Sequence, residues 1–344
     1  MSKKILLVAA VTLAACSSDK TPAELKVDAL TNMKGLITTN LDALVADVQA
    51  LSDAAPDAQA DGWTESRDRA AVELMKARWK RARQDYEHVE GAIAVLFPEL
   101  DVSTDERYDG FVETNGADED PFDDQNVTGV HAIERILWAD AIPDKVKTFE
   151  QGLPNDVYRA ARWPQNATEA SDFKDKLVHK LLVDVTTMRD EFKPLALDPA
   201  AAWRGVTGSM HEQVEKAEVA ASGAEESRYA QYTLADMRAN LDAGLEVYAA
   251  FQPWIIAVAG DAENAKLSAG FDKLKAAYAR LSGDALPDVP ATWSSQSPSS
   301  ADLATPFGQL WKSIADQADE TASGALVYEM NVTADKLGIA ALPQ

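Results

Sequence analysis

The chain has 344 residues, a length that fits one large domain or two ordinary ones. Hydrophobic residues make up 46% of it and charged residues 26%, which is typical of a globular protein and excludes a disordered one. Its 33 Lys and Arg against 56 Asp and Glu give a formal net charge of −23, which disfavours nucleic acid and anionic membrane surfaces as ligands and favours cations.

The first residues have the pattern of a bacterial lipoprotein signal. Lys3 and Lys4 precede an apolar run that ends in Leu13-Ala14-Ala15-Cys16, which resembles a lipobox. We therefore predict a cleaved signal peptide over residues 1–15 and a lipidated tether over residues 16–20, with Cys16 acylated. Serine follows the cysteine, which by analogy favours the periplasmic side of the outer membrane. Because Cys16 is the one cysteine in the sequence, an internal disulfide and a thiolate zinc cluster are excluded.

Helical signals dominate the rest of the chain. Thr21-Pro22-Ala23-Glu24 combines a capping residue, a proline at the first helical position and a glutamate three residues after the cap. Apolar residues then recur at helical spacing to position 51, and again from about 61 to 97, where Pro98 ends the run. Further helices are predicted over 127–139, 168–192, 200–221, 225–258, 262–282, 300–322 and 325–337. Because no alternating strand pattern or hairpin dipeptide occurs, the sequence predicts an all-α protein.

Helices of this length joined by short turns usually pack as antiparallel bundles, so we predict two packed antiparallel helical bundles. The stretch 193–199 contains two prolines and is predicted to be the joint between them. This places the N-terminal bundle at 21–197 and the C-terminal bundle at 198–344. A second stretch rich in proline and serine, 284–300, is interpreted as a surface loop of the second bundle, with a third small unit as the alternative.

Two pairs of residues on the predicted helices combine carboxylates with an imidazole. His131 and Glu134 are three residues apart, as are Glu87 and Glu90, so each pair shares one helix face. Two facing helices of this kind would offer one imidazole and several carboxylates to a single cation, and similar sets in helical bundles hold iron or manganese. Taken alone the pattern is weak, because such spacings more often give an ion pair or a solvated face.

The residues around these pairs resemble the imelysin-like family. Residues 82–93, 100–107 and 128–138 follow the order of its Arg-to-Tyr-Glu-x-x-Glu helix, its Asp–Arg turn and its His-x-x-Glu helix. The blocks 223–229 and 234–240 resemble its next two motifs, Gly-Glu-Glu-x-Arg-Tyr and an Asp-to-Asn helix. The branch that the chain resembles best is that of periplasmic iron-uptake lipoproteins of the EfeO/EfeM type. This resemblance implies a fold of two helical bundles with the histidine motif near the groove between them.

The resemblance also implies a metal site. Its implied ligands are Glu90, Asp105, His131 and Glu134, with Glu87 as a fifth candidate. The implied residues that line the groove or bridge the bundles are Glu225, Glu226, Arg228 and Tyr229. Oxygen-rich ligation favours hard or borderline cations over copper or cadmium, and the resemblance implies iron, with zinc or calcium as alternatives. The chain departs from the family at two places. Gly91 stands where the family has proline, and an acidic insertion over 116–124 separates the turn from the histidine. These departures bear on which metal is bound more than on whether a metal site exists.

Two other patterns have weaker metal signals. The acidic loop 116–124 lacks the glycine and distal glutamate of an EF-hand, so we interpret it as solvated charge before a helix. His211, Glu212 and Glu215 resemble the zinc-protease His-Glu-x-x-His helix, but a glutamate stands at the second histidine position.

The function favoured by the sequence is that of a lipoprotein on the periplasmic side of the outer membrane, which binds a metal ion, iron first, and passes it to an inner-membrane iron permease. The alternatives are an imelysin-type metallopeptidase and a polysaccharide-binding lipoprotein. A peptidase needs an open metal position and a general base, for which Glu134 or Glu90 would have to serve. The sequence offers no second histidine for a zinc triad, so we favour a binding protein over an enzyme.

Overall fold

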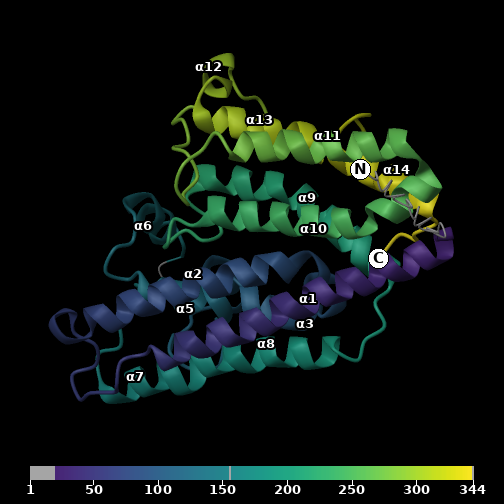
Figure 1. Cartoon of the computed structure of the whole chain (residues 1–344). Coiled ribbons are helices and arrows are strands. Elements are labelled where there is room, and N and C mark those ends of the chain that lie inside the picture. The colour runs from purple at the N-terminus through teal and green to yellow at the C-terminus, as the bar shows by residue number, and fades with distance from the viewer. Residues whose placement is uncertain (1–19, 155, 343–344) are drawn as a thin grey trace, which may run out of the picture.

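The computed structural model describes residues 20–154 and 156–342. All regular elements in this part of the chain are helices, so the prediction of an all-α protein is confirmed for the described residues (Figure 1). Cys16 and the predicted signal peptide lie outside them. No helix within the described ranges combines the length and the apolar character that a membrane crossing needs.

The helices differ widely in length. The longer ones are α1 (Pro22–Asp53), α2 (Glu65–Leu96), α8 (His179–Phe192), α9 (Pro199–Glu218), α10 (Thr233–Ala259), α11 (Asp261–Tyr278), α13 (Pro306–Ala318) and α14 (Leu326–Leu337). The shorter ones are α3 (Pro98–Asp105), α4 (Tyr108–Asn115), α5 (Gly129–Leu137), α6 (Asp144–Gln151), α7 (Ala167–Asp172) and α12 (Ser300–Leu303). A π-helical segment, Phe173–Val178, joins α7 to α8, and a 3-10 turn, Val219–Ser222, follows α9. The capping box predicted at Thr21 and Glu24 is present at the start of α1.

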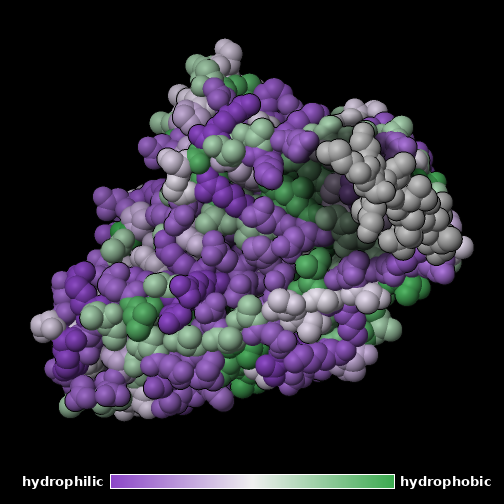
Figure 2. Space-filling model, in the orientation of Figure 1, coloured by the Kyte–Doolittle hydropathy of each residue, from purple (hydrophilic) through white to green (hydrophobic). Residues whose placement is uncertain are grey.

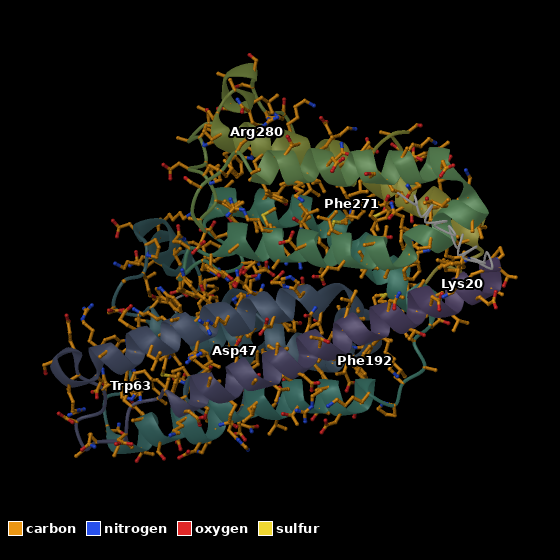
Figure 3. The ribbon with its side chains drawn as sticks, in the orientation of Figure 1. Lys20, Asp47, Trp63, Phe192, Phe271 and Arg280 are labelled. Atoms are coloured by element: carbon orange, nitrogen blue, oxygen red, sulfur yellow. The ribbon has the colours of Figure 1, made fainter. Side chains whose placement is uncertain are left out.

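Two groups of helices meet along α1 and α2 (Figure 1). In the first group α1 and α2 run in opposite directions, α8 packs on α1, and α3 packs on α2, α5 and α8. In the second, α9 and α10 pack on α2, and α11, α13 and α14 lie beyond them. Phe192 and Phe271, in opposite halves of the molecule, belong to one continuous cluster of buried apolar side chains (Figure 3). The boundary at 197/198 falls in the loop between α8 and α9 and stays a prediction.

The outer surface is largely polar. Hydrophilic side chains cover most of the face seen in Figure 2, and hydrophobic ones form smaller areas between them. This distribution agrees with the large excess of acidic over basic residues in the sequence.

The helix predicted over 225–258 begins only at Thr233. The residues before it are irregular, because Gly223 (φ 82°) and Gln231 (φ 52°) adopt left-handed conformations that a helix cannot continue through. This correction matters for the candidate site, because the irregular backbone places Glu226 in the interior. Glu226 is 8% exposed there.

Five further elements differ from the prediction. The helices α3, α4 and α6 have eight residues each, too few for an apolar repeat to mark them in the sequence. The segment predicted as one helix over 300–322 is divided, because Thr305 caps α13 by accepting a hydrogen bond from the Gly308 N–H. The helix predicted over 168–192 is interrupted by the π-helical segment.

The helices α2 and α9 come into backbone contact at two glycines. A Cβ atom on Gly205 of α9 would lie 2.0 Å from the carbonyl oxygen of Gly91 on α2, so this position has no room for a side chain. A Cβ atom on Gly91 would lie 3.1 Å from Cβ of Ser209. The contact therefore sets the spacing between the two helices, and Glu87 and Glu90 lie within one turn of it on α2.

We expect Gly205→Ala to lower the free energy of unfolding by about 1–3 kcal/mol, because the added methyl group overlaps the facing backbone. Gly208→Ala is the matched control, since its added Cβ has no neighbour within 4 Å and helix propensity favours alanine by up to about 1 kcal/mol. Urea denaturation followed by circular dichroism measures both. Equal stability of the two variants would contradict the proposed contact.

Candidate metal centre

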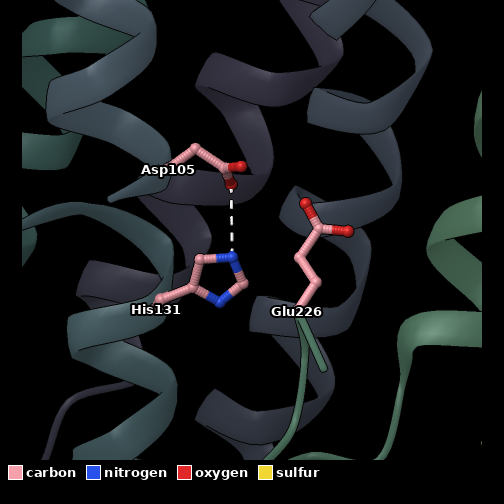
Figure 4. Close-up of side chains that lie close together, drawn as sticks. All are labelled: Asp105, His131 and Glu226. Carbon is pink, nitrogen blue, oxygen red and sulfur yellow. Dashed lines mark ion pairs between the residues drawn. The ribbon is translucent and has the colours of Figure 1, made fainter. Parts of the chain in front are cut away.

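Two short helices bring a histidine and an aspartate together. At the first residue of α5, Gly129 (φ 84°), a Cβ atom would lie 2.2 Å from the carbonyl oxygen of Thr104, so only glycine lets α5 begin so close to the end of α3. The side chains of His131 and Asp105 consequently face each other (Figure 4). The distance from His131 Nε2 to Asp105 Oδ1 is 3.4 Å.

The position of α5 is fixed from the other side by α2. The buried indole N–H of Trp79 donates a hydrogen bond to the carbonyl oxygen of Val130 at 2.8 Å, one residue before His131. The same indole packs edge-on against Trp138 at the end of α5, with ring centroids 5.2 Å apart. Both ends of α5 are thus held on one residue of α2.

Glu226 completes this group from the irregular segment before α10. Asp105, His131 and Glu226 each offer one ligand atom, and these atoms lie within 4.8 Å of one another. Two ligand atoms about 2.1 Å from a tetrahedral metal ion lie roughly 3.4 Å apart, the separation found between His131 and Asp105. Within the described chain, His131 Nε2 is buried and has no hydrogen-bond partner. The three side chains therefore fit a metal ion, and their chemistry suits iron, manganese or zinc.

Glu134 holds the imidazole from behind. Its Oε2 lies 2.9 Å from His131 Nδ1, and its Oε1 accepts a hydrogen bond from the backbone N–H of Ala230 at 2.7 Å. A carboxylate on the far nitrogen of a metal-binding histidine fixes the tautomer and the orientation of the ring, and leaves Nε2 for the metal. The structure thus gives Glu134 a positioning contact with His131, and the ligand role that the resemblance implies stays a prediction.

Glu87 and Glu90 form a second carboxylate group with Glu226. Lys216 of α9 lies within this group, with Nζ 3.1 Å from Glu87, 3.2 Å from Glu90 and 2.9 Å from Glu226. Asn240 of α10 also donates a hydrogen bond to Glu90 Oε2 at 2.9 Å. These two predicted ligands are therefore engaged by Lys216 in this structure, next to the His131 group.

Arg83 joins the two groups from α2. Its guanidinium is fully buried and forms ion pairs with Glu87, Asp105, Glu226 and Asp236. Arg83 and Lys216 are not among the site residues predicted from the sequence. The spacing of Arg83 four residues before Glu87 is a usable signal. No such spacing marks Lys216, because its partner Glu87 lies 129 residues away in the chain.

The charges around His131 and Asp105 shift their proton affinities. Burial lowers the pKa of His131, but Asp105 and Glu134 outweigh burial and raise this pKa to about 9. Burial raises the pKa of Asp105, but Arg83 and His131 outweigh it and hold this pKa below its ordinary value. A metal ion that binds His131 near neutral pH must therefore displace a proton from the imidazole.

A cavity of about 270 Å³ borders both groups. Its walls consist of Glu90, Asp105, Arg107, Glu212, Glu215, Lys216, Val219 and Glu226. Burial and the neighbouring charge of Glu90 raise the pKa of Glu212 to about 7. The carboxylates of the His-Glu-x-x-Glu pattern therefore line this cavity, whereas His211 contacts the carbonyl oxygen of Ala318, with Nδ1 3.2 Å from it.

The remaining predicted groove residues, Glu225, Arg228 and Tyr229, are buried and pair elsewhere. Their partners are Lys145 for Glu225, with 2.6 Å between the charged atoms, Asp109 for Arg228, and Glu150 for Tyr229. In the acidic loop 116–124, Asp118 is 2% exposed and accepts a hydrogen bond from the Asp120 N–H, so the interpretation of solvated charge is wrong for that residue.

The comparison with protein families covers the whole of this site. The Imelysin family matches residues 35–322, a span that includes every residue of both carboxylate groups. No curated protein matches the chain. Because the match extends over most of the sequence and over the residues that form the centre, the chain belongs to the imelysin family.

Proposed function

We propose that this protein captures one metal ion at Asp105, His131 and Glu226 and serves iron uptake in the cell envelope. The observation that carries the proposal is the buried Nε2 of His131, which faces two carboxylates and makes with Asp105 an ion pair of 3.4 Å, longer than a well-formed hydrogen bond. An imidazole with carboxylates suits iron better than a soft metal such as copper(I). Iron is therefore the proposed cargo, and zinc and calcium are the alternatives.

The location is the second part of the proposal. The lipobox-like residues before Cys16 support a lipid anchor on the periplasmic side of the outer membrane. The formal net charge of −23 raises the concentration of cations near the protein, which suits a role in capture. We propose that the ion then passes to an inner-membrane iron permease, as the resemblance to EfeO/EfeM-type lipoproteins implies.

The geometry favours binding over peptide hydrolysis. A metallopeptidase needs a general base that is free to take a proton from the metal-bound water. Both oxygens of Glu134 are engaged, by His131 and by the Ala230 N–H. Glu90 is engaged by Lys216 and Asn240. Asp105 and Glu226 are also engaged, by Arg83 and in the case of Glu226 by Lys216 as well, so engagement alone does not separate the two functions. Binding is favoured because the capture of an ion needs no free base, whereas hydrolysis does.

A polysaccharide role receives less support from the cavity at the site. Sugars are commonly bound by stacking on aromatic rings, and the side chains that line this cavity are charged apart from one valine.

Removal of the histidine tests the proposed site. We expect the wild-type chain to bind one Mn²⁺ or Fe²⁺ ion, and His131→Ala to weaken binding by more than about 100-fold because it removes a ligand. Glu134→Gln is expected to weaken binding by about 10–100-fold, since it removes only the positioning contact. Isothermal titration calorimetry measures the affinities, and circular dichroism checks that the helices remain.

The matched control is His88→Ala, which removes a histidine of α2 whose Nδ1 lies 2.8 Å from the carbonyl oxygen of Gln84. We expect this variant to bind as the wild type does. Unchanged binding in His131→Ala would contradict the proposed site. Hydrolysis of peptides by the wild type, abolished in His131→Ala, would favour the peptidase instead.

Metal affinity is expected to rise with pH from 6 to 8. The pKa of His131 is raised to about 9, so the imidazole is protonated throughout this range. Because the metal ion competes with this proton, the metal affinity should rise by up to about tenfold for each unit of pH. Mn²⁺ titrations at three pH values measure this slope. In His131→Ala the slope should be lost, and a wild-type affinity that does not change with pH would show that Nε2 is not a ligand.

A further inference from the structure

A second cation position lies beside the metal group, and a side chain of the protein fills it. Three carboxylates meet here, with one oxygen of each within 4.8 Å of the others: Glu87, Glu90 and Glu226. The ligand atoms of the His131 group lie within the same distance of one another. The Lys216 ammonium lies 2.9–3.2 Å from all three. It therefore occupies the space between three carboxylates, as a bound cation would.

We propose that Lys216 is a tethered cation that blocks a second metal position and limits the protein to one ion per chain. This inference rests on the proposed capture of a metal at Asp105, His131 and Glu226.

Glu226 links the two positions, because it belongs to both groups. Its Oε2 lies 2.9 Å from Lys216 Nζ, and its Oε1 lies 2.9 Å from Arg83. Two-metal centres hold their ions about 3.5–4 Å apart between neighbouring ligands, and helical bundles build such centres from glutamates and histidines on facing helices. The chain thus has the ligand types of a two-metal centre, with an ammonium in one of the two places.

The lysine is held firmly in this place. It is 7% exposed, and a buried ammonium is stable only when nearby carboxylates offset the cost of removing it from water. Burial lowers the pKa of Lys216, but Glu226, Glu87 and Glu90 outweigh it and raise this pKa well above its ordinary value. The side chain therefore remains charged, and its three N–H donors can serve three carboxylates.

The group could still accept more positive charge. Burial raises the pKa of Glu87 well above its ordinary value in spite of Arg83 and Lys216, and the like charges of Glu90 and Glu226 add to the effect. A divalent ion in place of the ammonium would offset this burial better than a single charge does.

The test is the number of Mn²⁺ ions bound by Lys216→Gln. We expect one ion in the wild type and two in the variant, counted by calorimetry and by metal analysis after gel filtration. Two Mn²⁺ ions at the spacing of a two-metal centre should also give a magnetically coupled electron paramagnetic resonance spectrum, and we expect the wild type with one ion to give an uncoupled one. Because the variant loses its buried cation, its Tm without metal should fall, and Mn²⁺ should raise this Tm more than it raises that of the wild type.

Lys266→Gln is the matched control. Lys266 also bridges two carboxylates, with Nζ 3.2 Å from both Glu263 and Glu329, but it is half-exposed and has no histidine group beside it. We expect this variant to bind one ion.

The outcomes separate the two proposals. If the wild type binds one ion and Lys216→Gln binds one or none, the proposed role of Lys216 is overturned. Two ions in the wild type would also overturn it, and this measurement does not depend on how the variant folds. No ion in the wild type with one in Lys216→Gln would overturn the proposed function and support the blocked position. No ion in either protein would overturn both.

Discussion

Carboxylates that are removed from water need positive charge within reach, and this constraint determines the arrangement of the interior between α2, α5 and α9. Arg83 and Lys216 supply permanent positive charge there, and His131 supplies a third charge only while it is protonated. The carboxylates around them outnumber these cations. Isolated charges would not be tolerated at such depth, so the group is stable only as a unit. A metal ion that replaces the proton of His131 adds charge where the protein lacks it.

Close approach of backbones makes this unit compact. Gly129 lets α5 begin against the end of α3, and Gly205 lets α9 meet α2. Long side chains lose conformational entropy when they are fixed, so short distances between rigid helices reduce the freedom that each ligand must give up. These glycines therefore shape the candidate metal centre as well as the helix packing, because they bring groups that are far apart in sequence to within a few ångströms.

The sequence predicts the helices well where they are long and the site only where its members lie on one helix. The spacing of His131 and Glu134 places both side chains at the centre, but spacing alone cannot tell a ligand from the carboxylate that orients it. Glu226 is assigned to the groove only through the family resemblance, because no spacing pattern links it to Asp105 or His131, and the left-handed Gln231 that ends the irregular segment has no strong sequence signal. Lys216 is missed because long-range pairing depends on how α9 packs on α2, which no local pattern encodes.

The three members of the metal group are held by different kinds of support. Asp105 and His131 belong to helices, whereas Glu226 comes from irregular backbone between Gly223 and Gln231. This backbone is buried, and the residues on either side of Glu226 are held by ion pairs, Glu225 with Lys145 and Arg228 with Asp109. The loss of either ion pair would therefore displace Glu226 without a change in any of the three side chains of the metal group.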